Sequence, residues 1–310
     1  MVLAEKMRYN FSKSSGTEHL PDLFIRTAWT GNSNEREKER TDMFWEELTS
    51  ADFAKAVKEH QVCVIPMGVV EKHGDHLPLA TDMIEGRKIA ELAAAIEPFV
   101  IFPYYYFGQI NEARHTPGTI AVSPKIQLEL LEEVVKEIRR NGFKKIVLLE
   151  SHGGNIALCD YFLQGQAYEE KDYVVYKIGL WDFFSKVLAE IPDEYKEEPD
   201  GHAGRTETEW VMAARPELVH MDRENPEGAV YNHRMDHLAG ANTGLTWYSA
   251  HPTHQESSAA NASREVGELK YKIASEYVAD IIKRIKEDTV AQDVYDEYFA
   301  RCKKVSSVEI

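Results

Sequence analysis

The chain has 310 residues, of which 43% are hydrophobic and 28% are charged, as in ordinary globular proteins with a sizeable core. These values exclude a fully disordered chain, a collagen-like repeat and a coiled-coil rod. Acidic residues number 52 against 36 basic ones, so the formal net charge is −16. Because this surface repels phosphate groups, we expect neither nucleic acid nor an anionic membrane as a partner.

The cysteines and the N-terminus indicate the compartment. Cys63, Cys159 and Cys302 cannot pair completely and contain no CxxC motif, which argues against a disulfide framework and a thiolate zinc site. No apolar run reaches the ~18 residues that span a bilayer, and the first residues lack the apolar segment of a secretory signal. We therefore expect a cytoplasmic protein.

The pattern of apolar residues predicts the elements in chain order. Residues 1–40 are polar and weakly periodic, and they predict an N-terminal extension before one domain over 41–310. Helical spacing predicts a first helix over about 41–60, capped by Thr41. Further on, strands are predicted over 62–68, 99–103, 144–150 and 172–180, and helices over 83–96, 126–142, 156–170 and 262–287, with a shorter helix last. This alternation predicts an α/β fold with a mostly parallel sheet flanked by helices on both faces.

In such sheets ligands collect beyond the carboxyl ends of the strands, and a polar cluster follows the strand at 62–68. Glu71 and His73 are two residues apart, so in extended backbone both face one cavity. Gly74 and Pro78 turn the chain, which would bring Asp82 back to the same point. Imidazole and carboxylate ligands suit Zn, Mn or Fe. A solvated acidic loop is the alternative.

A second cluster, Ser151-His152-Gly153-Gly154-Asn155, follows the strand at 144–150. Glycines after a strand let the backbone bend sharply, which would place His152 at the carboxyl edge of the sheet. A phosphate-binding loop is the rival interpretation, but the Gly-Lys-Ser/Thr of such loops is absent from this segment. An ordinary tight turn is the third possibility.

A third cluster, from Asp200 to Glu209, opens a helix predicted to begin near Glu207. His202 is a candidate general acid or base because the pKa of a free imidazole is about 6.5. Glu207 is a candidate ligand, and Glu209 is interpreted as a first-turn acid that favours the helix dipole.

Together the three clusters predict a site for two metal ions. Bridging carboxylates hold such ions about 3.5–4 Å apart, and the pair activates a water near neutral pH. No serine stands in a GxSxG motif, which argues against a serine hydrolase.

Four segments in this order resemble the signatures of the creatininase (creatinine amidohydrolase) family over roughly residues 43–285: IPMGVVEKHGDHLPLATD, ARHTPGTI, SHGGN and DGHAGRTET. The resemblance implies a metal-dependent hydrolase on an α/β fold, often hexameric, with two divalent ions. By position, Glu71 and His152 would bind one ion, His73 the other, and Asp82 both. His202 would transfer the proton, supported by Asp200. His115, in the second signature, is expected to bind substrate.

Three positions depart from creatininase proper. Gly154 stands where that enzyme has a glutamate ligand, and the resemblance indicates Glu207 as the substitute. Gly201 replaces a glutamate before the HAG histidine. Glu198 replaces the lid tryptophan, which points away from creatinine itself because an aromatic lid suits a flat cationic ring. Trp181 is aligned with a second active-site tryptophan and is expected to bind substrate.

His251 and His254 form an HxxH in the polar stretch HPTHQESS, where the family usually has an aspartate-containing sequence. A surface loop is the default interpretation, and a role in the site stays open.

We expect a small polar substrate and a homo-oligomer, with a hexamer implied by the family. The first hypothesis is C–N hydrolysis of a cyclic amide or formamide. The alternatives are C–C hydrolysis of a cyclic polyol ketone such as an inosose, and cleavage of a peptide bond near a terminus. A non-catalytic metal-binding scaffold is the hypothesis of another class, although such a module has no need of His202.

Overall fold

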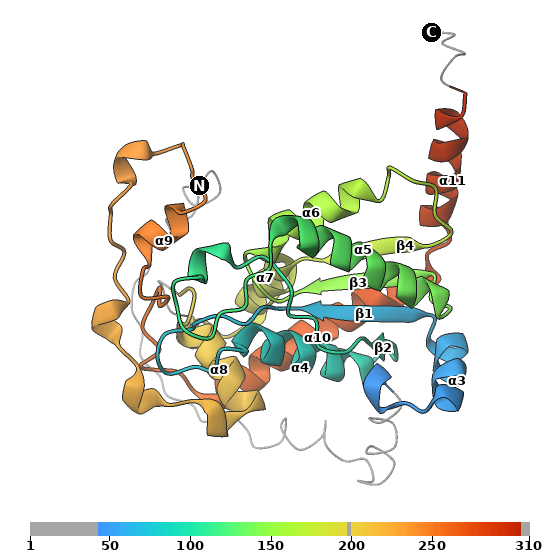
Figure 1. The fold of residues 1–310 in the computed structure, drawn as a ribbon. Helices are drawn as coiled ribbons and strands as arrows, with labels where there is room; N and C mark the ends of the chain where they lie inside the picture. Colours follow the sequence, from blue (N-terminus) through green and yellow to red (C-terminus); the bar gives the residue numbers. More distant parts are fainter. Residues whose placement is uncertain (1–42, 197–199, 305–310) are drawn as a thin grey trace, which may run out of the picture.

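Four short parallel strands form the centre of the computed structural model, which describes residues 43–196 and 200–304 (Figure 1). They are β1 (Val62–Met67), β2 (Val100–Ile101), β3 (Lys145–Glu150) and β4 (Val174–Ile178). The order across the sheet is β2-β1-β3-β4, and every neighbouring pair is parallel. The predicted α/β fold with a parallel sheet is therefore confirmed.

Helices cover both faces of the sheet. One face packs against α4 (Thr81–Ala94), α7 (Leu180–Glu190), α8 (Arg205–Ala214) and α10 (Arg264–Glu287), and the other against α3 (Ser50–His60), α5 (Pro124–Arg140) and α6 (Asn155–Gly165). Two more helices, α9 (Thr246–Ala250) and α11 (Val290–Cys302), lie at opposite ends of the molecule (Figure 1). Single 3-10 turns (η1–η7) lie at Trp45–Glu47, Asn111–Ala113, Asp193–Tyr195, Pro216–Leu218, Met221–Arg223, Pro226–Gly228 and Asp236–Leu238.

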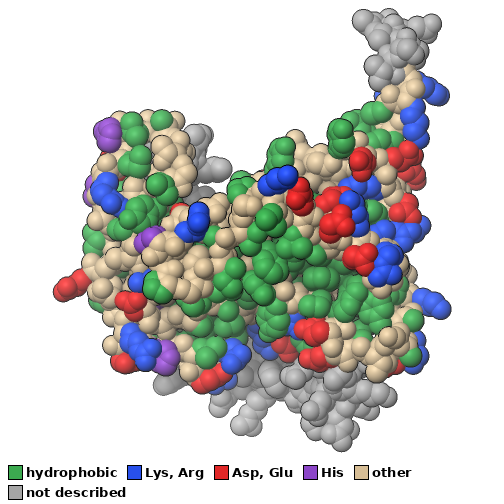
Figure 2. Space-filling view, viewed as in Figure 1, with side chains coloured by type: hydrophobic (Ala, Val, Ile, Leu, Met, Phe, Trp, Pro, Cys, Tyr) green, Lys and Arg blue, Asp and Glu red, His purple; other side chains and the backbone are tan. Residues whose placement is uncertain are grey.

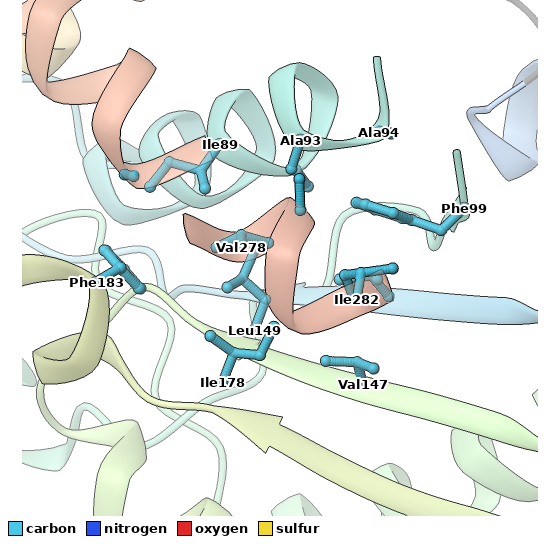
Figure 3. Packing of buried hydrophobic residues seen from close by; sticks show 14 of the residues in the cluster. Ile89, Ala93, Ala94, Phe99, Val147, Leu149, Ile178, Phe183, Val278 and Ile282 are labelled. Atoms are coloured by element: carbon cyan, nitrogen blue, oxygen red, sulfur yellow. The ribbon is translucent and has the colours of Figure 1, made fainter. Parts of the chain in front are cut away.

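The core consists of two apolar layers separated by the sheet. All six residues of β1 are buried, and their side chains alternate between the layers because successive residues of a strand face opposite sides. Val64 joins the layer under α4 and α10, while Ile65 joins the layer under α5 and α6. Figure 3 shows the first layer, in which Val278 of α10 lies over Leu149 of β3. This packing fixes the ends of the strands.

The first predicted helix is wrong at its start. The structure has a 3-10 turn at Trp45–Glu47 and begins α3 only at Ser50. Thr49 is the cap, because its hydroxyl accepts a hydrogen bond from the backbone N–H of Asp52 at 3.2 Å. Thr41 and the predicted extension over 1–40 lie outside the described residues. Sequence reasoning also missed α7, and it placed the start of α8 two residues late.

On the face shown in Figure 2, apolar side chains gather in the middle, and charged side chains of both signs lie mainly towards the rim. Within the two described stretches of chain, no helix combines the length and the apolar character needed to cross a membrane. In Figure 1 the arrow of β1 points towards the side on which α8 and α9 lie. The polar clusters of the sequence meet on that side.

Candidate metal centre

The loop after β1 turns back on itself and brings three acidic or imidazole side chains together. The backbone N–H of Glu71 donates to the carbonyl of Leu79 at 2.9 Å, and Gly74 at the turn has φ +57°. Asp82 then lies in the first turn of α4, where negative charge is favourable. Its Oδ1 is 3.0 Å from Nε2 of His73. Glu71, His73 and Asp82 are only 1%, 0% and 2% exposed.

His152 reaches the same point from the end of β3. Its Nδ1 is 3.0 Å from Oε1 of Glu71 and 3.1 Å from Oδ2 of Asp82. Its Nε2 donates to the backbone carbonyl of Gln109 at 2.9 Å, so Nδ1 is the nitrogen that faces the two carboxylates and would bind an ion once its proton leaves. A backbone carbonyl that fixes the far nitrogen is the usual second contact of a metal-bound histidine.

The start of α8 supplies the remaining polar side chains. Glu207 accepts a hydrogen bond from the N–H of Ala203 at 2.6 Å, and its Oε2 is 3.7 Å from Nε2 of His73. His202 lies with Nε2 2.9 Å from the carbonyl of Lys72 and 3.9 Å from Oε2 of Glu71. Both His202 and Glu207 are partly exposed, so this side of the cluster is the open one.

Three groups of these side chains lie close enough to hold an ion; two of them share the carboxylate of Asp82, and the third is Glu71, His73 and His202. Glu71, Asp82 and His152 make the first group, and His73, Asp82 and Glu207 make the second. Asp82 uses Oδ2 in the first and Oδ1 in the second. Oε1 of Glu71 and Oδ2 of Asp82 are buried without an aligned hydrogen bond, although Nδ1 of His152 is near both. Buried carboxylate oxygens in this condition fit a cation between them.

The charges of the cluster support one another. Burial alone would raise the pKa of Glu71, but His202 and His152 hold it well below its usual range. Burial opposes protonation of His73, yet Asp82 and Glu207 raise its pKa to about 10. Burial raises the pKa of Glu207 to about 7, against the attraction of His73. Asp82 and Glu71 likewise raise the pKa of His152 against the effect of burial, so protons on His73 and His152 supply the positive charge that the carboxylates require.

The creatininase (creatinine amidohydrolase) family model matches residues 46–282. The chain belongs to the creatininase family. It is 26% identical over 261 residues to the creatinine amidohydrolase of Pseudomonas putida, covering 78% of this chain and 96% of that protein. It is 21% identical to the 3-dehydro-scyllo-inosose hydrolase of Thermotoga maritima, covering 80% and 85%.

A solved family structure from Bacteroides fragilis superposes with a TM-score of 0.69 at 25% identity, covering 80% of this chain and 98% of that one. Solved creatininases with the same fold include a manganese form and a zinc–zinc form. Members of the family are metal-dependent hydrolases, and this chain is an enzyme of that class.

The departure from creatininase at Gly154 has a steric reason here. A Cβ at this position would lie 2.6 Å from the carbonyl oxygen of Gln109 and 2.6 Å from Nε2 of His152. A glutamate at 154 would therefore displace the contact that orients His152. Glu207, which approaches His73 from α8, is the carboxylate in the second ligand group. This position agrees with the substitution inferred from the sequence.

Three residues assigned from the creatininase resemblance lie at the margin or away from the cluster. Asp200 hydrogen-bonds the hydroxyl and the N–H of Thr206 at the start of α8, and no hydrogen bond within the described residues joins it to the imidazole of His202. Trp181 is 61% exposed and has its aromatic contact with Phe184, at 5.9 Å. His115 is exposed, and its ring centroid lies 5.0 Å from that of His254.

The segment of α9 and the HxxH forms a wall of the site that sequence reasoning missed. Trp247 lies 5.2 Å from the ring of His202 and 4.9 Å from that of His254. His251 and His254 are both buried, so the surface-loop interpretation is wrong. The one available signal was the replacement of the family's aspartate-containing sequence by two histidines.

Proposed function

We propose that this enzyme uses two divalent ions, Zn, Mn or Fe, to hydrolyse the C–N bond of a small cyclic amide or formamide. The observation that carries the proposal is the shared carboxylate of Asp82, whose two oxygens belong to two separate ligand groups. Glu71 and His152 would complete the first site, and His73 and Glu207 the second. Bound there, the ions supply Lewis-acid activation of a water and of the substrate carbonyl.

His202 is suited to deliver the proton that the leaving nitrogen needs. The carbonyl of Lys72 accepts only, so the hydrogen bond at 2.9 Å requires a proton on Nε2 of His202. This nitrogen also faces Glu71, and the ring is partly exposed on the open side of the cluster. A short rotation would move its N–H from Lys72 to the leaving atom. Burial and the charge of His73 lower the pKa of His202 to about 4, so at neutral pH the ring is unprotonated at one nitrogen and would first accept a proton there before passing one to the leaving atom.

The test combines metal content with turnover. Purified protein should contain about two ions per chain by elemental analysis, and it should hydrolyse one compound from a panel of creatinine, formamides, inososes and short peptides. A chelator should abolish the activity, and the same metal should restore it. Asp82→Asn is the inactive control. Two ions without turnover of any compound would favour the scaffold hypothesis, and absence of metal after soaking would contradict the mechanism.

C–C hydrolysis of a cyclic polyol ketone is the second candidate, and the wall of the site favours it. The imidazole nitrogens of His115, His202 and His254 lie around Trp247 and can hydrogen-bond the hydroxyl groups of a polyol. The similarity to an inosose hydrolase over 85% of its length agrees with this view. The inosose arm of the same panel decides between the two reactions.

We also propose that the enzyme is a homo-oligomer, and a hexamer by analogy with its family. Light scattering on the full chain tests this, because six copies of a 35.4 kDa chain are readily distinguished from one or two.

A further inference from the structure

His254 is a buried histidine whose ring nitrogens make no hydrogen bond to the described residues, although Nδ1 lies 3.7 Å from the carboxylate of Glu71. Its side chain is 0% exposed, and neither Nδ1 nor Nε2 makes a hydrogen bond within the part of the chain that the structure describes. Its backbone has φ +55°, a left-handed conformation that is uncommon for residues other than glycine. Two hydrogen bonds hold that backbone: Gly74 N–H to its carbonyl at 2.6 Å, and its own N–H to His251 at 3.1 Å.

The ring lies at the outer oxygen of Glu71. Oε1 of this carboxylate faces His152, whereas Oε2 is 3.7 Å from Nδ1 of His254 and 3.9 Å from Nε2 of His202. His254 belongs to neither of the two ligand groups that share Asp82. It therefore lies beside the candidate metal centre, with its ring centroid 5.9 Å from that of the partly exposed His202.

The two histidines at Glu71 differ in what their nitrogens do. Nε2 of His202 donates a hydrogen bond to the carbonyl of Lys72, whereas neither ring nitrogen of His254 makes a hydrogen bond to the described residues. Leaving such groups buried and unpaired is unfavourable, and strained backbone at a site is a sign of function. An imidazole ring offers two nitrogens for hydrogen bonding, and a hydroxyl or amide group is a matching partner.

We propose that His254 contacts the substrate, through a hydrogen bond to a neutral hydroxyl or amide group beside the carbonyl that is attacked. The proposal rests on the proposed function for the identity of the reacting site. The same segment also supports His202: Glu256 accepts from the N–H of His202 at 3.2 Å and donates its own N–H to the His202 carbonyl at 2.7 Å. A Cβ at Gly201 would lie 2.5 Å from the Glu256 carboxyl carbon, so Glu256 occupies the space that a side chain at position 201 would need.

The test measures binding apart from turnover. Creatinine, as the amide probe, and scyllo-inosose, as the hydroxyl probe, are titrated by calorimetry into the metal-loaded full chain. His254→Phe keeps a ring but removes both nitrogens, and it should weaken the dissociation constant of the bound probe about tenfold. His254→Asn keeps a donor and an acceptor and tolerates positive φ, so it should stay within about threefold of wild type. His233→Phe, at an exposed histidine that also has positive φ (+52°) and pairs with Asp236 outside the site, is the matched control and should change neither constant.

The outcomes separate the hypotheses. Weakening with creatinine alone assigns an amide contact, and weakening with the inosose alone assigns a hydroxyl contact. Equal binding by wild type and His254→Phe, or no binding of either probe at millimolar concentration, overturns the proposal. Loss of metal from His254→Phe, with an unchanged melting temperature, overturns it as well, because His254 would then be a ligand. Failure of the proposed function appears differently, as binding without metal-dependent hydrolysis.

Discussion

Strand β1 and the loop that follows it are equally buried but chemically opposite. The six residues of β1 are buried with their apolar side chains in two well-packed layers. A few residues later, Glu71 and His73 are just as inaccessible, yet Oε1 of Glu71 has no aligned hydrogen bond. Apolar burial stabilises the fold by itself, whereas buried charge is unfavourable unless it is compensated. The comparison indicates that the strand serves stability and the loop serves a cation.

Asp82→Ala should have the largest effect, because it removes the one carboxylate common to both ligand groups. We expect loss of both ions and a fall in hydrolysis of at least about 10³-fold, measured by elemental analysis and turnover. Asp75→Ala is the control from the same loop, since Asp75 is exposed and pairs with Lys72 at 2.8 Å. Two ions per chain in Asp82→Ala would contradict the shared-carboxylate site.

His202→Ala should lower turnover by about 10²–10⁴ while the metal content stays unchanged, because the variant loses the proton donor and keeps both ligand groups. The exposed His233, which pairs with Asp236, provides a control substitution to alanine without effect on either quantity. Full turnover in a metal-loaded His202→Ala protein would show that another group moves the proton.

Ile65→Ala tests the role of strand β1 in stability. Truncation of this fully buried side chain should reduce the free energy of unfolding by about 2–5 kcal/mol, through lost burial and the cavity that remains. Urea denaturation of the metal-loaded protein measures the change. The ions per folded chain should not fall; if they do, the strand and the loop are not the independent regions described here.

Metal affinity should rise with pH, by about tenfold per pH unit for each proton displaced. Without metal, Asp82 and Glu207 raise the pKa of His73 to about 10 against the opposing effect of burial, so the ring holds a proton at neutral pH. A cation must displace that proton, and lower pH therefore weakens binding. Competition with a chromophoric chelator between pH 6 and 9 gives the slope, and a flat profile would rule out displacement of a proton from this histidine.

The strands and the residues at their ends could be predicted because local patterns specify them. Short β-branched runs predicted the strands, and the parallel order of the sheet brings Glu71, His73 and His152 to one edge. The start of α3 was predicted too early because the helical spacing of apolar residues extends back through Trp45. In the structure the helix begins only after Thr49, whose hydroxyl accepts the capping hydrogen bond. The assignment of Glu71, His73 and His152 as metal ligands remains a prediction.

Trp247 and His254 could not be placed from the sequence for a different reason. They follow a stretch in which single 3-10 turns alternate with exposed chain, and such a stretch has no periodicity from which to infer its path. Tertiary contacts bring this segment to the site, such as the hydrogen bond from the backbone N–H of Gly74 to the carbonyl of His254. Burial of His254 depends on these distant partners.

The reciprocal hydrogen bonds between His202 and Glu256 join segments 54 residues apart in the chain. The candidate metal ligands come from the loops after β1 and β3 and from α4 and α8, whereas Trp247 and His254 come from the segment between α8 and α10. Under the proposed function, reactivity and selectivity are encoded in separate stretches of sequence. Within such an architecture, exchange of residues 219–262 between family members would graft a new substrate preference onto an unaltered catalytic core, provided that the pairing of His202 with Glu256 is kept.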